Sequence, residues 1–152
     1  MRIRGFQRVT LIDYPGKIAC TIFLYGCNFK CGFCHNPELV LAPDASLDIS
    51  EQEILDYLEM RKPLLEGICF TGGEPLLRIE MEFLKKIKEI GYLIKIDTNG
   101  SCPEVLQKLI EANLVDYVAM DIKASKDNYK KVTNSEINLE AIEQSIDIIS
   151  KL

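Results

Sequence analysis

The sequence predicts an α/β fold, specifically a partial, open parallel βα barrel with about four βα units. Three observations lead to this prediction. Short apolar runs rich in β-branched residues recur along the chain, and amphipathic helical patterns lie between them. The 152 residues supply four βα units, about half of what a closed eight-stranded barrel of roughly 250 residues requires. Strands that alternate with helices form βαβ units with parallel strands and right-handed crossovers.

Four apolar runs are predicted to be short buried strands. The runs are ACTIFLY (19–25), GICFT (67–71), LIKIDT (93–98) and YVAMDIK (117–123). Residues 1–17 are predicted to form an N-terminal arm or edge strand with a turn at Tyr14-Pro15-Gly16. Residues 18–152 then supply the βα units. The whole chain, 1–152, is expected to be a single domain, either a natural short form or a product truncated at its C-terminus.

The helices between and after these strands are predicted from their end signals and apolar periodicity. They run from the capping box of Ser50 and Glu53 to about Met60, from Glu80 to Ile90 before Gly91, from Pro103 to about Ala112 before Asn113, and from Asn138 through Ile142, Ile146 and Ile149. Segments 42–46 and 125–136 are predicted to be polar loops with no further role.

The composition argues against several classes of protein. The formal net charge is -5 and the pI is about 5.0, whereas nucleic-acid-binding domains usually carry a basic face. Residues 1–16 lack the apolar stretch of a signal peptide, and no run approaches the about 18 apolar residues of a membrane span, so a cytoplasmic protein is expected. Six cysteines could form disulfides, but a reducing compartment and their uneven spacing disfavour this pairing.

Residues that a structural protein would not need follow each predicted strand. They are GCNFKCGFCHNPE (26–38), GGEP (72–75), NG closing DTNG (97–100), and DIK (121–123), which ends the fourth run. The carboxyl ends of parallel strands share one face, and ligands bind there in α/β folds. The four motifs are therefore expected to converge in space.

The first motif places Cys27, Cys31 and Cys34 on one loop, followed by the only histidine, His35. Thiolates at this C-x3-C-x2-C spacing can hold zinc or an iron–sulfur cluster. A structural zinc would need His35 as its fourth ligand, which requires an awkward backbone because His35 adjoins Cys34. A cubane cluster on three cysteines would instead leave one iron open to a small molecule. The polar and glycine residues around the cysteines make this a poor core segment.

The other motifs are weaker on their own. The glycines of GGEP would let the backbone approach a ligand closely, and Glu74 could accept hydrogen bonds from an ammonium group, although Gly-Gly is more often only a turn. Asp97 and Asp121 could bind ribose hydroxyls or a cation, unless they are simply solvated strand ends. The isolated cysteines are predicted to be strand core residues, Cys20 and Cys69, or to have no assigned role, Cys102.

Taken together, the motifs resemble the radical S-adenosylmethionine (radical SAM) superfamily. The resemblance rests on C-x3-C-x2-C with Phe33 before the last cysteine, followed by GGE after the second strand. More narrowly, LIDYPGKIACTIFLYGCNFKCGFCHNPEL with GGEPLL, DTNG and MDIK is similar to the activating enzymes of glycyl-radical proteins. The likeness is greatest to activating proteins of the anaerobic ribonucleoside-triphosphate reductase, with pyruvate formate-lyase activating enzymes as near relatives.

The resemblance implies a set of residues for each ligand. Three irons of a 4Fe-4S cluster would be held by Cys27, Cys31 and Cys34, and the fourth by S-adenosylmethionine. The cofactor would contact Phe33, Cys34, His35, Gly72, Gly73, Glu74, Thr98, Asp121 and Lys123. Residues 33–35 would lie against its adenine, and 72–74 would receive its ammonium group. A monovalent cation would be surrounded by Asp97, Thr98 and Asp121.

The resemblance also implies a reaction and partners. A reduced cluster would cleave S-adenosylmethionine to a 5′-deoxyadenosyl radical, which would take hydrogen from a glycine of a glycyl-radical enzyme such as the anaerobic reductase. The electron would come from a low-potential donor such as flavodoxin or ferredoxin, and no catalytic acid or base is assigned. The alternatives are a radical SAM enzyme for a small molecule, such as a deazapurine synthase, and a non-enzymatic zinc or electron-transfer protein.

Overall fold

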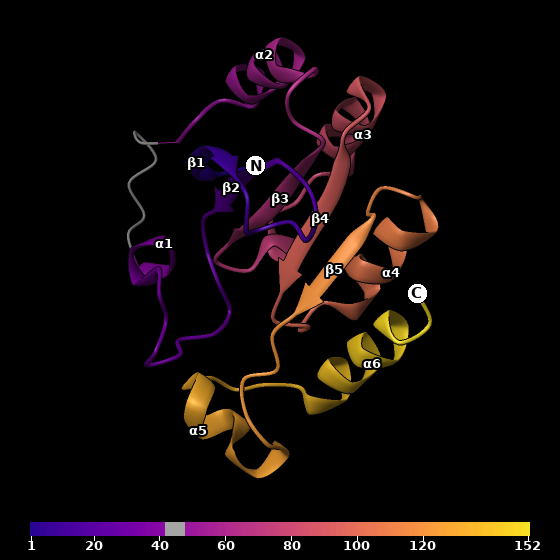
Figure 1. The fold of residues 1–152 in the computed structure, drawn as a ribbon. Helices are drawn as coiled ribbons and strands as arrows, with labels where there is room; N and C mark the ends of the chain where they lie inside the picture. Colours follow the sequence, from indigo (N-terminus) through magenta and orange to yellow (C-terminus); the bar gives the residue numbers. More distant parts are fainter. Residues whose placement is uncertain (42–47) are drawn as a thin grey trace.

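Parallel strands form the centre of one mixed sheet. The computed structural model describes residues 1–41 and 48–152, and its strands lie in the order β1-β2-β3-β4-β5 (Figure 1). The strands are β1 (Ile3–Thr10), β2 (Ala19–Leu24), β3 (Gly67–Gly72), β4 (Leu93–Thr98) and β5 (Tyr117–Met120). β1 pairs antiparallel with β2, and β2 to β5 are parallel. The predicted α/β fold and the predicted edge strand in 1–17 are confirmed.

Helices connect the parallel strands and follow the last one. They are α1 (Pro37–Leu41), α2 (Glu51–Arg61), α3 (Met81–Ile90), α4 (Pro103–Glu111), α5 (Tyr129–Thr133) and α6 (Leu139–Ile149), with 3-10 turns η2 (Pro75–Leu77) and η3 (Lys126–Asn128). The predicted end signals are confirmed: the Ser50 hydroxyl accepts the Glu53 N–H at 3.1 Å, and Gly91 ends α3 with φ 95°. Within the described ranges, no helix is long and apolar enough to cross a bilayer.

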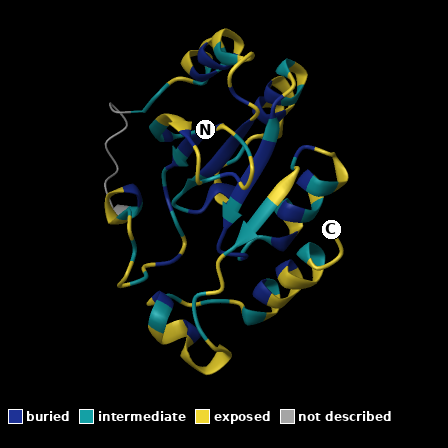
Figure 2. Ribbon diagram, in the orientation of Figure 1, coloured by how far each residue is buried: buried dark blue, intermediate teal, exposed yellow. Residues whose placement is uncertain are grey.

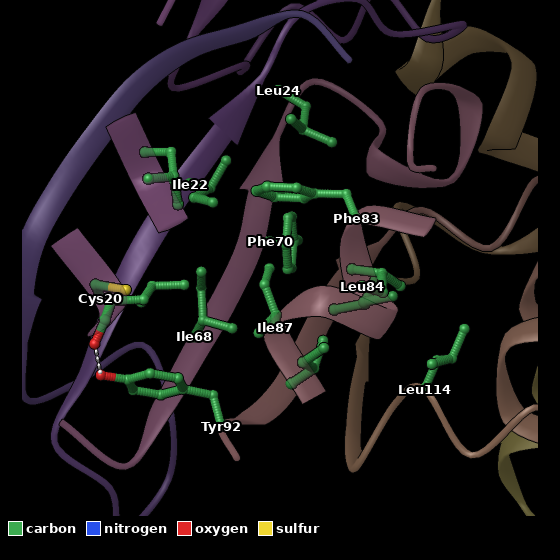
Figure 3. Packing of buried hydrophobic residues seen from close by; sticks show 14 of the residues in the cluster. Cys20, Ile22, Leu24, Ile68, Phe70, Phe83, Leu84, Ile87, Tyr92 and Leu114 are labelled. Atoms are coloured by element: carbon green, nitrogen blue, oxygen red, sulfur yellow. Dashed lines mark hydrogen bonds between the residues drawn. The ribbon is translucent and has the colours of Figure 1, made fainter. Parts of the chain in front are cut away.

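The two faces of the sheet have different environments because successive side chains of a strand point to opposite sides. One face packs against α2, α3 and α4 and forms the main core, in which the Phe70 and Phe83 rings meet edge to face at 6.3 Å (Figure 3). The other face, which we call the inner face, carries Thr21, Cys69, Lys95 and Asp97. Figure 2 shows the central strands buried and β5 more exposed.

The N-terminal arm covers part of the inner face. Tyr14 is buried, and a Cβ at Gly67 would lie 2.7 Å from the Tyr14 ring. The same ring meets Tyr117 of β5 edge to face at 6.0 Å, and the Thr21 hydroxyl donates to Asp13 of the arm at 2.6 Å. The predicted core residue Cys20 lies in the main core, whereas Cys69 is buried on the inner face.

Two sequence-based expectations were wrong in detail. The fourth strand ends at Met120, so 121–123 leave the sheet. Segment 125–136 is not a polar loop without a role, because it contains η3 and α5 and buries Tyr129 and Thr133. Its few inward-facing residues are hidden in a sequence dominated by polar ones. The loop predicted at 42–46 lies outside the described residues.

Candidate functional site

A cavity of about 280 Å³ lies at the carboxyl ends of the parallel strands. Its wall contains every residue that the sequence placed in the site: Cys27, Cys31, Phe33, Cys34, His35, Gly72, Gly73, Glu74, Asp97, Thr98, Asp121 and Lys123. Further wall residues were not predicted: Phe29, Asn36, Val40, Thr71 and Asn99. The expected convergence of the motifs is therefore present, while the role of each residue remains a prediction.

The cysteine-bearing loop after β2 is supported by residues that do not belong to the sheet. Phe29 is 3% exposed and packs with Tyr129 and Ile142, and the Phe29 and Tyr129 rings lie 6.3 Å apart. The Lys30 N–H donates to the carbonyl of Thr133 at 2.9 Å. Segment 125–136 thus supports the loop that carries the thiols.

The chemistry of the three thiols fits an iron–sulfur cluster. Cys27, Cys31 and Cys34 are free and half-buried. Burial raises the pKa of Cys27 and Cys31, so both are neutral thiols until a metal displaces their protons. Among the described residues, no three His, Cys, Asp or Glu side chains are placed to hold one metal ion together. Three soft sulfur donors on one loop suit a cluster in which three of the irons take one thiolate each.

The glycines of the GGEP motif allow two segments of the backbone, the loop after β3 and the loop after β2, to lie in close contact. A Cβ at Gly73 would lie 2.0 Å from the carbonyl oxygen of Gly26, and Gly72 has φ 112°, which disfavours other residues. The Gly73 N–H donates to the Leu24 carbonyl at 2.9 Å, and the Glu74 N–H donates to the Gly26 carbonyl at 2.8 Å. The glycines therefore attach the loop after β3 to the start of the cysteine loop.

Glu74 connects the loops that follow β3 and β4. Its side chain is 1% exposed. Oε1 accepts from the Thr98 hydroxyl at 2.7 Å and the Leu76 N–H at 3.1 Å, while Oε2 accepts from the Asn99 N–H at 2.7 Å. Burial raises the pKa of Glu74, and these hydrogen bonds oppose that rise by stabilising the carboxylate.

Asn99 links the DTNG motif to the first cysteine. Its side-chain amide donates to Sγ of Cys27 at 3.8 Å and to the side-chain oxygen of Asn28 at 3.0 Å. Its own side-chain oxygen accepts from the Ser101 N–H at 2.9 Å. Asn99 is 6% exposed, so its amide is held in one orientation beside the thiol.

Two ion pairs accompany the aspartates of the cavity. Lys123 pairs with Asp121, and its ammonium lies 5.8 Å from the centre of the Phe33 ring. Burial lowers the pKa of Lys123, but the opposing interactions, chiefly the hydrogen bond and charge of Asp121, leave it raised, so the group stays charged. On the inner face, Lys95 pairs with Asp97.

The family model of the Radical SAM superfamily matches residues 21–152. The chain belongs to the radical SAM superfamily. It is 38% identical over 147 residues to a Methanocaldococcus jannaschii protein that is provisionally named a glycyl-radical enzyme activating enzyme. It is 33% identical over 139 residues to the pyruvate formate-lyase-activating enzyme of Clostridium pasteurianum. These matches cover 95% and 87% of this chain but 59% and 57% of the relatives, so the chain spans about three-fifths of their length.

Solved structures share the fold of this radical SAM chain. QueE from Escherichia coli aligns with a TM-score of 0.63 at 15% identity, over 99% of this chain and 75% of that one. The protein anSMEcpe with bound AdoMet aligns with a TM-score of 0.62 at 18% identity, over 84% of this chain and 38% of that one. At these identities the likeness concerns the fold alone.

The sequence analysis assigned no role to three residues that lie in the cavity wall or beside it. Lys95 could have been noticed as a lysine among the apolar residues of 93–96, and Asn99 belongs to the NG that was expected at the strand ends but was given no role of its own. Phe29 is an apolar residue between Asn28 and Lys30 in a polar loop. Its packing partners lie about one hundred residues away in sequence, so their identity was not predictable.

Proposed function

We propose that this protein is a radical SAM activating enzyme that installs a glycyl radical on a partner, and that the partner is an anaerobic ribonucleoside-triphosphate reductase. One observation carries the proposal: three thiols from a single short loop share a cavity with the GGE, DTNG and DIK residues. The names of the relatives support an activating enzyme, and the resemblance of the motifs supports the reductase as partner. A cytoplasmic location, expected from the sequence, belongs to the same proposal.

The residues of this chain would bind and orient the cofactors. Cys27, Cys31 and Cys34 would hold the cluster. When bound, a reduced cluster supplies the electron that cleaves S-adenosylmethionine to a 5′-deoxyadenosyl radical, which takes hydrogen from the target glycine. Oε2 of Glu74 accepts the Asn99 N–H and has a second acceptor position for the ammonium group of the cofactor.

The mouth of the cavity offers groups for the rest of the cofactor. Phe33 is 53% exposed, and its ring provides a face against which adenine can stack. His35 is also exposed at this mouth and would lie on the same side. Lys123 is held by Asp121 and would contribute positive charge near the cofactor carboxylate.

Anaerobic reconstitution with iron and sulfide tests the cofactor assignment. The wild-type protein should become brown and, with dithionite, convert S-adenosylmethionine to 5′-deoxyadenosine. Cys31→Ala should lose this product. Cys102→Ala removes a thiol outside the cavity wall and should retain it. If Cys31→Ala formed 5′-deoxyadenosine at the wild-type rate, the assignment of Cys31 as a cluster ligand would be wrong.

Electron paramagnetic resonance tests the partner. A candidate anaerobic reductase, incubated with the reconstituted protein, S-adenosylmethionine and reduced flavodoxin or ferredoxin, should develop a glycyl doublet. Pyruvate formate-lyase is the comparison partner. Cofactor cleavage with no glycyl signal on either partner would favour a small-molecule substrate. A protein that bound metal but never cleaved the cofactor would be the non-enzymatic alternative.

A further inference from the structure

A buried lysine lies on the inner face beside the cavity. Lys95 is 6% exposed, and in the sheet register it lies between Cys69 of β3 and Tyr117 of β5. Tyr14 of the N-terminal arm packs against Tyr117 on the same face. A lysine buried in this way is costly unless its charge is compensated.

Asp97 compensates that charge. The Lys95 ammonium forms an ion pair with Oδ1 of Asp97 and lies 3.5 Å from Sγ of Cys69. The Cys69 thiol is in turn 3.5 Å from Oδ2 of Asp97. Both carboxylate oxygens of Asp97 therefore have a partner within the protein.

The other two groups expected around a monovalent cation are also occupied. The Thr98 hydroxyl donates to Glu74 and accepts the Gly100 N–H at 3.0 Å. Asp121 pairs with Lys123. Asp97 and Asp121 are each already paired with an ammonium group, so a cation added beside either carboxylate would meet the like charge of its lysine. These residues do not fit a cation site.

We propose that the ammonium group of Lys95 takes the place of the monovalent cation in this protein, so that Asp97 and Asp121 bind neither Na⁺ nor K⁺. A lysine ammonium is a compact point charge and can compensate the carboxylate without an exchangeable ion. Lys95 is then a positioning residue that acts through Asp97. Its relevance to S-adenosylmethionine rests on the proposed function, but its effect on cation binding does not.

Thermal unfolding of the cluster-free full chain tests this inference without any cofactor. At equal ionic strength, the wild-type midpoint should agree within about 1 °C in KCl, NaCl and choline chloride. Lys95→Met should unfold earlier in choline chloride and recover by about 3 to 5 °C in KCl or NaCl, because a cation can now bind Asp97. Lys95→Arg should restore the cation-independent behaviour. Lys88→Met, which breaks the surface pair with Asp116, should show no such response.

Two results would overturn the inference: a wild-type midpoint raised by K⁺ or Na⁺ over choline, or a Lys95→Met variant equally unstable in all three salts. If Lys95→Met does not fold, the comparison of the wild type in the three salts still tests the inference. The double variant Lys95→Met with Asp97→Asn provides a second test. It has no carboxylate at position 97 to compensate, so its unfolding midpoint should not depend on the cation. Equal S-adenosylmethionine affinity of the reconstituted wild type in choline and potassium buffers is also expected. Absence of S-adenosylmethionine binding in every salt would count against the proposed function instead.

Discussion

The backbone N–H of Asn99 donates a 2.7 Å hydrogen bond to the buried carboxylate of Glu74. This bond joins the loop after β4 to the loop after β3. Glu74 is itself attached through its N–H to Gly26 at the start of the cysteine loop. Hydrogen bonds therefore connect the three strand-end loops directly, with Glu74 as their common partner.

Glu74 should make stability depend on pH in a defined direction. Burial raises its pKa above the unfolded value of 4.5, and a group with a raised folded-state pKa favours folding while it is protonated. That contribution is full below about pH 4.5 and is lost as the pH rises through the folded-state pKa. The free energy of unfolding of the wild type, measured in urea relative to Glu74→Gln, should fall as the pH rises above about 4.5. The 79% exposed Glu82 provides the control Glu82→Gln, and parallel profiles for Glu74→Gln and wild type would contradict the prediction.

Gly73→Ala should destabilise the protein strongly. Its Cβ would collide with the carbonyl oxygen of Gly26, which is backbone and cannot rotate away. We expect a loss of about 3 kcal/mol or more in the free energy of unfolding, together with poor iron loading. Gly32→Ala is a matched control on the cysteine loop, because its Cβ would meet no heavy atom of the described residues within 4 Å. Equal stability of the two variants would refute the close approach of the backbones.

Two phenylalanines of the cysteine loop are predicted to have different roles. We expect Phe29→Ala to weaken the packing that holds the loop, and Phe33→Ala to weaken the binding of S-adenosylmethionine. Phe29 is 3% exposed against Tyr129 and Ile142, so its truncation should cost about 3 to 5 kcal/mol and reduce iron loading. Phe33 is 53% exposed, so its truncation should change stability by less than about 1 kcal/mol. S-adenosylmethionine affinity should nevertheless drop in Phe33→Ala. Urea unfolding measures the first effect and equilibrium dialysis the second. A Phe29→Ala variant as stable as the wild type would show that the packing of Phe29 against Tyr129 and Ile142 is dispensable.

Asn99→Ala should lower the reduction potential of the reconstituted cluster. The side-chain amide lies 3.8 Å from Sγ of Cys27, and hydrogen bonds to ligating sulfurs stabilise the more negative, reduced state. Loss of one such bond corresponds to about 20 to 60 mV for one electron. Redox titration monitored by electron paramagnetic resonance measures the shift. Gln107→Ala, on α4 and outside the cavity wall, should leave the potential unchanged. An unchanged potential in Asn99→Ala would remove Asn99 from this role.

Local sequence signals predicted most of the fold. Gly91 ends α3 and Pro103 begins α4 where the end signals placed them, because capping depends on a few adjacent residues. Most members of the cavity wall were also predictable, because parallel strands place their carboxyl ends on one side. The structure of segment 125–136 was not predictable, because the burial of Tyr129 depends on Phe29, a residue on a loop that is distant in the sequence.

The sequence by itself determined the strands, the helices between them and the residues that meet at the strand ends. It determined these because periodicity, end signals and strand direction are local properties. Only the tertiary structure decided which group each polar side chain contacts: Glu74 with Asn99 and Thr98, and Lys95 with Asp97 and Cys69. Alternation places Lys95 and Asp97 together on the inner face, but the contact of Lys95 with Cys69 depends on the register of β3 and β4. This register is a non-local property, set only when the chain has folded.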